Sequence, residues 1–79
     1  MIAQNLTIRY DKVGDILYID RCPPYADQES EEIGDEVVAR MNPTTGTIEN
    51  LAILFFSKRL QTTNIFKLPV IADLQLASL

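Results

Sequence analysis

The sequence LAILFF at residues 51–56 places the strictest demand on the fold. In an extended strand its alternate members face opposite sides, so both faces of that strand present apolar side chains that need cover. A chain of 79 residues buries only about 60% of the surface that it exposes when unfolded. We therefore expect part of this apolar surface to lie against a second copy of the chain. The alternative is a monomer whose last residues fold back over the second face.

A first hairpin is predicted near the N-terminus. Residues 6–10 alternate apolar and polar side chains, which is typical of a strand with one wet face, and ILYID at residues 16–20 follows as a second strand. Between them, Asp11 can accept hydrogen bonds from the backbone ahead of it, and Gly14 can take the positive φ of a tight reversal. Because apolar residues occupy both phases of ILYID, this second strand is expected inside the sheet.

A second hairpin is predicted around NPTTG at residues 42–46. Pro43 presets φ for a type I turn, and Gly46 suits the left-handed position after it. EVVARM before the turn and TIENLAILFF after it supply the two strands. With the first hairpin they would form a four-stranded antiparallel β-meander.

Residues 21–35 are predicted to form an exposed connection, because RCPPYADQESEEIGD has no apolar period and its two prolines cannot donate to a sheet. An acidic cluster with no basic member lies in and directly after this connection: Asp27, Glu29, Glu31, Glu32, Asp35 and Glu36. A solvated loop accounts for such a cluster, and a surface that meets a basic partner protein is the functional alternative.

The C-terminal segment is predicted to add one or two short helices. Ser57 before KRLQ can cap a helical turn, and Pro69 can take the first position of a helix that runs through residues 70–79. The same segment could equally lie extended, since periodicity does not separate the two conformations in so short a stretch. The predicted fold is therefore a single α+β domain over residues 1–79, a four-stranded antiparallel β-meander with one or two short C-terminal helices.

Two stretches, YDKVGDILYI and VVARMNPTTGTIENLAILFFSKRL, carry a family resemblance. Together with the acidic stretch between them they resemble a family of small bacterial domains known as domain of unknown function 2283, over roughly residues 6–60. The resemblance implies a small β-rich fold with a C-terminal helical element and no assigned activity. It also implies a possible antitoxin role, because related genes are sometimes found beside small toxin-like proteins. The chain departs from the family in IENLAI, where a Gly-Ile-Glu sequence is usual, and in its tail.

Composition argues against several classes of function. The net charge of −4 disfavours direct binding of DNA or RNA, which requires a basic surface. The absence of histidine and the single cysteine, Cys22, leave neither an internal disulfide nor the usual ligands of zinc or iron, so no metal or cofactor is expected. The longest apolar run is far below the ~20 residues that span a bilayer, and no signal-peptide pattern precedes it. We expect a cytoplasmic protein without a membrane partner.

Individual polar residues offer few candidate sites. Asp11, Asp15 and Asp20 could hold calcium or magnesium, but turn formation explains the first two without a ligand. Cys22 has Arg21 beside it and no histidine to take a proton, so it is expected to be an inert thiol.

Two further groups have structural explanations that we favour. Tyr10, Tyr18 and Tyr25 could form an aromatic platform for a ligand, but tyrosine also suits packing on a half-buried strand. The residues 57–59, Ser-Lys-Arg, could attract an anion at a helix start, but capping alone accounts for the serine.

The function predicted from these features is that of an interaction or scaffolding module without catalytic activity, assembled as a homodimer or higher homo-oligomer. The expected subunit contact comprises Leu54 and Phe56 in the last strand with Ile71 and Leu74 in the tail. The alternative is an antitoxin-like regulator, whose acidic cluster would neutralise a basic toxin.

Overall fold

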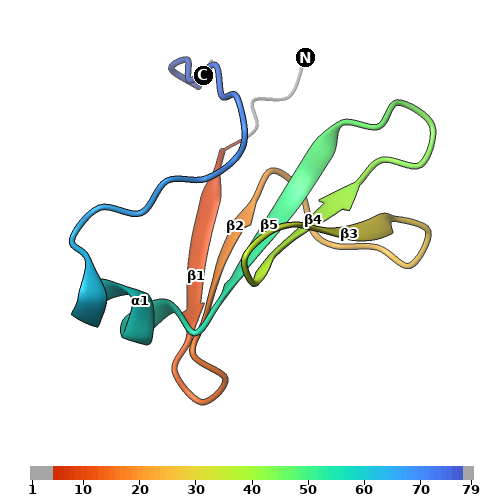
Figure 1. The fold of residues 1–79 in the computed structure, drawn as a ribbon. Helices are drawn as coiled ribbons and strands as arrows, with labels where there is room; N and C mark the ends of the chain where they lie inside the picture. Colours follow the sequence, from red (N-terminus) through yellow and green to blue (C-terminus); the bar gives the residue numbers. More distant parts are fainter. Residues whose placement is uncertain (1–4, 78–79) are drawn as a thin grey trace.

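The computed structural model describes residues 5–77. Within that range five strands form one antiparallel sheet in the spatial order β1-β2-β5-β4-β3, and a helix follows the last strand (Figure 1). The elements are β1 (Thr7–Asp11), β2 (Ile16–Asp20), β3 (Glu29–Gly34), β4 (Val37–Met41), β5 (Ile48–Leu54) and α1 (Phe56–Thr62). The strand that carries most of the apolar run, β5, is therefore the centre of the sheet.

The expected α+β fold built on antiparallel strands is confirmed, but the four-stranded meander is wrong. Both predicted hairpins form, because β1 pairs with β2 and β4 pairs with β5. β5 also pairs with β2, so β2 and β3 are not neighbours although they follow one another in the sequence. The connection between them carries the chain from one half of the sheet to the opposite edge.

The fifth strand, β3, lies inside residues 21–35, for which the sequence predicts an exposed connection. It is an edge strand that pairs only with β4, and its first four residues are exposed on both phases. A strand of this kind shows no apolar period, because pairing with its neighbour holds it extended without burial of one face. Its carboxylates suit an edge position, since charged edge strands resist unwanted pairing with other chains.

The turn between β1 and β2 forms with one correction. The Asp11 carboxylate accepts hydrogen bonds from the backbone N–H groups of Val13 and Gly14, both at 3.1 Å, as predicted. The positive φ belongs to Asp15, at 57°, and not to Gly14. A Cβ at Gly14 would lie 2.9 Å from Asp11 Oδ2, so a larger residue would displace the carboxylate that accepts the hydrogen bonds of this turn. In the second hairpin Gly46 does adopt the predicted left-handed conformation, with φ of 75°.

The strand β5 ends where Phe55 adopts a left-handed conformation, with φ of 54°. This turn breaks the alternation of the apolar run, so that Phe56 begins α1 and packs against the same core as Ile53. Residues 63–77 contain no helix, so the second helix that Pro69 could have started is not present up to residue 77. Residues 78 and 79 of that predicted helix lie outside the described range.

The core lies on one face of the sheet, which we call the covered face. Four side chains are buried there: Val37, Ala39, Leu51 and Ile53. The tail, residues 63–77, crosses this face, and Phe66, Leu68 and Val70 pack against the buried cluster. These three residues are half-buried while their neighbours in the sequence are exposed, which is the period of an extended segment lying on a sheet.

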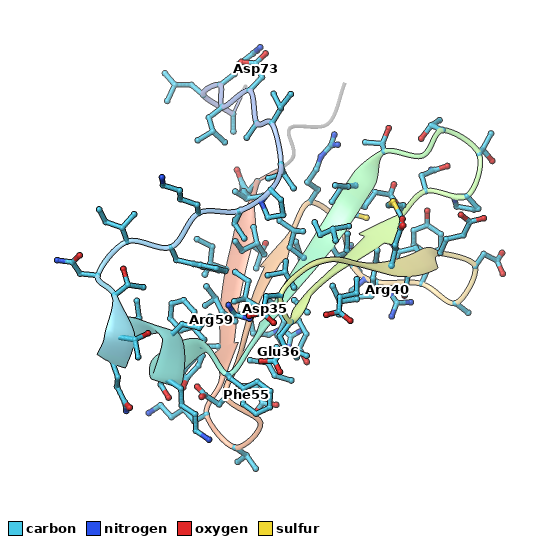
Figure 2. All side chains as sticks on the ribbon, viewed as in Figure 1. Asp35, Glu36, Arg40, Phe55, Arg59 and Asp73 are labelled. Carbon is cyan, nitrogen blue, oxygen red and sulfur yellow. The ribbon has the colours of Figure 1, made fainter. Side chains whose placement is uncertain are left out.

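Arg59 of α1 fixes the start of the tail. Its Nε donates to the backbone oxygen of Leu54 at 2.8 Å, and its guanidinium donates to the backbone oxygen of Asp35. The same group lies 4.9 Å from the ring centroid of Phe66 and 4.0 Å from a carboxylate oxygen of Glu36. Figure 2 shows Arg59, Asp35 and Glu36 side by side at the end of the sheet. One side chain thus joins the helix, the β3–β4 turn and the first residue of the tail that contacts the core.

Candidate functional site

The second face of the sheet, which we call the open face, is defined by the strand register. Directly paired residues point to the same side of a sheet. Tyr18 pairs with Ala52, and Ala52 pairs with Val38, so these three share one face. The buried residues Leu51 and Ile53 alternate with Ala52 and point to the covered face. The apolar run therefore supplies both faces of β5, as the sequence predicts.

One end of the open face is closed by a buried polar network. Asn50 is 3% exposed and donates to Asp20 Oδ1 at 2.9 Å and to the backbone oxygen of Cys22 at 2.7 Å. Gln28 donates to Asn50 Oδ1 at 2.6 Å and accepts from Arg40 Nε at 2.8 Å. These bonds draw the connection between β2 and β3 across the sheet. Within residues 5–77 no buried side-chain nitrogen or oxygen lacks a partner, so the network serves the fold and holds no spare group aimed at a ligand.

Tyr25 and Glu49 form the outer part of this network. The Tyr25 hydroxyl donates to Glu49 Oε1 at 2.6 Å, and Gln28 donates to the same oxygen at 3.0 Å. The bond to the carboxylate, together with desolvation, raises the pKa of Tyr25 to about 12. The Tyr25 and Gln28 hydrogen bonds hold the pKa of Glu49 below its usual value. The sequence patterns did not predict this network, although an asparagine inside an otherwise apolar strand is a signal of a buried polar contact.

The remaining half of the open face is apolar. It consists of Ile16, Tyr18, Val38, Ala52 and Leu54, which we call the open apolar patch. Each member is half-buried by its neighbours within the sheet. The tail residues that reach the core lie on the opposite, covered face. Arg9, which pairs with Tyr18, lies over this patch with its guanidinium carbon 4.0 Å from the Tyr18 ring centroid.

The four predicted contact residues do not lie on one surface. Leu54 belongs to the open apolar patch, whereas Phe56 packs on the covered side with its ring centroid 6.0 Å from that of Tyr10. Ile71 and Leu74 line a groove between the tail and the covered face, with a volume of about 620 Å³. They project into solvent, with exposures of 103% and 81%. The structure thus brings Ile71 and Leu74 together and separates them from Leu54.

The acidic cluster is exposed to solvent. All six predicted residues are exposed: Asp27, Glu29, Glu31, Glu32, Asp35 and Glu36. The middle three, Glu29, Glu31 and Glu32, lie on the edge strand β3. Glu31 pairs with Ala39 and so belongs to the covered face, while Glu32 pairs with Val38 on the open face. The cluster is therefore divided between the two sides of the sheet and does not form one acidic surface.

The other sequence candidates have structural roles. Asp15 accepts hydrogen bonds from Tyr10 and Ser57, while Asp20 lies at the far end of β2 and binds Asn50. Among residues 5–77 no group of three acidic, cysteine or histidine side chains is arranged to hold a metal ion. Desolvation, with the Glu49 carboxylate second, raises the pKa of the Cys22 thiol. Tyr10 and Tyr18 pack on opposite faces, in line with the packing role favoured for them, since Tyr10 contacts Phe56 on the covered face and Tyr18 contacts Arg9 on the open face.

Comparison with known proteins identifies one family. No helix among the described residues is long and apolar enough to cross a membrane. No curated protein and no solved structure matches the chain. One family model, described as protein of unknown function (DUF2283), matches residues 7–57, which run from the first residue of β1 to the second residue of α1. The match covers most of the chain and all five strands, but not the tail, and it shows that this protein belongs to the DUF2283 family.

Proposed function

We propose that this protein is a non-catalytic interaction module that forms a homodimer through the open apolar patch. The observation that carries this proposal is the unequal cover of the two faces of β5. The tail packs on the covered face through Phe66, Leu68 and Val70, where Leu51 and Ile53 of β5 are buried. On the open face, Ala52 and Leu54 of the same strand stay partly exposed. Apolar patches on a sheet face commonly mark a contact with another protein.

A second copy of the chain is the simplest partner for this patch. Two sheets pack face to face about 10 Å apart with their inner side chains interleaved. A two-fold axis brings the same patch from each copy together, so one set of apolar residues covers the other. The buried network around Asn50 closes the neighbouring end of the face. The tails, on the far side of each sheet, would point away from the contact and stay available to other partners.

The variant Leu54→Glu tests the proposal. A carboxylate at this position of the central strand would be buried against the apolar residues of the second copy, and burial of an unpaired charge strongly opposes association. Val13→Glu is the matched control, because Val13 is 100% exposed at the tip of the first turn. We expect light scattering after size exclusion to give dimers for the wild type and the control and monomers for Leu54→Glu, with circular dichroism unchanged. A dimer that survives Leu54→Glu would contradict the proposal.

A second candidate function, the antitoxin-like regulator, is favoured by the free edge of β3. This strand pairs on one side only and carries Glu29, Glu31 and Glu32. An extended basic segment of a toxin could add to such an edge through backbone hydrogen bonds, with its cations near the carboxylates. Co-expression with a basic protein encoded beside this one tests the idea. Co-purification that is lost in the double variant Glu29→Lys/Glu31→Lys would support it, and failure to co-purify would count against it.

A further inference from the structure

A single row of paired residues crosses the whole open face. Arg9 of β1 pairs with Tyr18 of β2, and Tyr18 pairs with Ala52 of β5. Ala52 pairs with Val38 of β4, and Val38 pairs with Glu32 of β3. All five side chains point to the same side, because directly paired residues share a face. The row is apolar in its middle and ends in one positive and one negative side chain.

The two charged residues lie at equal numbers of strands from the centre of this row. Ala52 lies on the central strand, with two strands on either side of it. Strands are spaced about 4.8 Å apart, so Arg9 and Glu32 lie at similar distances from Ala52, each on the order of 10 Å. The smallest side chain of the row is thus at its middle, where two sheets can approach most closely, and the opposite charges are at its ends.

We infer that two copies of the chain pack with their open faces together around a two-fold axis that runs along β5, so that Arg9 of each copy meets Glu32 of the other. This inference rests on the homodimer proposed above and names its orientation. A two-fold axis along the strands places β1 of one copy over β3 of its partner. An axis across the strands would instead place β1 over β1, and Arg9 would face a second Arg9.

Charge therefore separates the two orientations. The axis along β5 forms two identical ion pairs, one at each side of the contact, and the axis across the strands forms two like-charge contacts. Within each copy the cation of Arg9 is held over the Tyr18 ring, which displays it on the open face. The Glu32 carboxylate accepts one hydrogen bond within its own chain, from the backbone N–H of Glu36 to Oε2 at 3.2 Å. Glu32 is nevertheless exposed, so that its carboxylate is accessible to a second copy.

The middle of the contact agrees with the same axis. Tyr18 of one copy would face Val38 of the other, and Ala52 would face its own copy. Leu54, which is two residues further along β5, would also lie on the axis and contact Leu54 of the partner. Association would then bury an apolar centre with a charged residue at each end, an arrangement that is common in protein interfaces.

Charge exchange between the two ends tests this orientation. In homodimers of Arg9→Glu or of Glu32→Arg both ion pairs become like-charge contacts. In a mixture of the two variants, each mixed dimer has two restored pairs. We expect the dissociation constant of each single variant to rise by roughly ten-fold, because two exposed pairs are lost and two repulsions are added. We expect the mixture to form mixed dimers about as tightly as the wild type, which native mass spectrometry resolves by mass.

The control is Glu31→Arg. It makes the same charge change on the adjacent residue of β3, but Glu31 pairs with Ala39 and belongs to the covered face. Glu31→Arg is expected to leave dimerisation unchanged and to form no preferred mixed dimer with Arg9→Glu. The mixed-dimer readout also removes any effect of Glu32→Arg on its own hydrogen bond to Glu36, since a folding defect cannot favour mixed dimers.

The results separate this inference from the proposal on which it rests. Preferred mixed dimers of Arg9→Glu with Glu32→Arg support the axis along β5. If Leu54→Glu prevents dimerisation while neither charge variant changes it, the open face is the contact and the proposed orientation is wrong. If the wild type does not dimerise, both the orientation and the homodimer are wrong.

Discussion

The Asp15 carboxylate accepts two hydrogen bonds from Ser57, one from its backbone N–H at 2.9 Å and one from its hydroxyl at 2.8 Å, although 42 residues separate the two. The turn of the first hairpin thereby caps α1, whose N-cap position holds Phe55 and offers no side-chain cap of its own. The Tyr10 hydroxyl donates to the same carboxylate at 2.6 Å. The Asp15 side chain therefore ties the helix, and the tail that follows it, to the β1–β2 hairpin.

Asp15→Asn should loosen α1. Asparagine also tolerates the left-handed conformation of this position, so the variant removes the charge and one acceptor without new backbone strain. We expect faster hydrogen exchange at the amides of residues 57–59 and a lower melting temperature. Asp73→Asn, in the exposed tail, is the control and should change neither. Unchanged exchange at Ser57 in Asp15→Asn would show that the cap contributes nothing to the helix.

The same cap predicts the response to acid. The hydrogen bonds from Tyr10 and Ser57 lower the pKa of Asp15 below 3.8. A carboxyl group with a lowered pKa in the folded state contributes stability that is present above its unfolded pKa and is lost as the pH falls through its folded pKa. We expect the free energy of unfolding to fall below about pH 3.8, and to fall less steeply in Asp15→Asn than in the wild type. Urea unfolding between pH 5 and pH 2 measures both slopes, and equal slopes would contradict the prediction.

The small core should be sensitive to a single cavity. Ile53 is 1% exposed and contacts both paired strands, so Ile53→Ala should lower the free energy of unfolding by about 2–5 kcal/mol. Leu76→Ala, at a residue that is 99% exposed, should stay within about 0.5 kcal/mol of the wild type. Chemical denaturation of all proteins at one concentration is the measurement, because a dimer's apparent stability depends on concentration. A loss below 1 kcal/mol for Ile53→Ala would mean that the face is not packed as described.

The Tyr25 hydroxyl should lose its proton at a higher pH than an ordinary tyrosine. Its bond to Glu49 raises its pKa to about 12, from 10.0 in the unfolded chain. A raised pKa in the folded state means that this contribution to stability is fully present below pH 10 and is lost as the pH rises towards 12. A titration followed by the absorbance of tyrosinate near 295 nm should therefore show one step at high pH, and Tyr25→Phe or Glu49→Gln should remove that step. If the step at high pH persists in Tyr25→Phe, it belongs to another tyrosine and the prediction is wrong.

Local pattern was enough to predict the hairpins and not enough to predict the sheet. The apolar stretch ILYID, the turn at Gly46 and the apolar run at residues 51–56 are each signals within a few residues, and each is found where it was predicted. The strand β3 was not predicted, because its first four residues are all polar and exposed and so show no apolar alternation. It is extended because it pairs with β4. The order of the strands depends on the pairing of β2 with β5, which no local sequence signal reports.

The long-range contacts could not be predicted either, because local sequence patterns do not report which distant residues meet. The cap of α1 joins Asp15 to Ser57, and the buried network joins Gln28 to Asn50. Each residue has an ordinary local explanation, and only the fold shows that the pairs meet. The apolar run supplies side chains to both faces of β5, as predicted. The tail supplies one cover through Phe66, Leu68 and Val70, an outcome that the sequence left open.

The central claim is that one copy of this chain does not cover its own sheet and that a second copy does. Sedimentation equilibrium of the unmodified protein over micromolar concentrations tests it most directly. The proposed homodimer predicts a molar mass of twice the 8.9 kDa of one chain. A mass of 8.9 kDa at every concentration from about 1 μM to about 100 μM would contradict it.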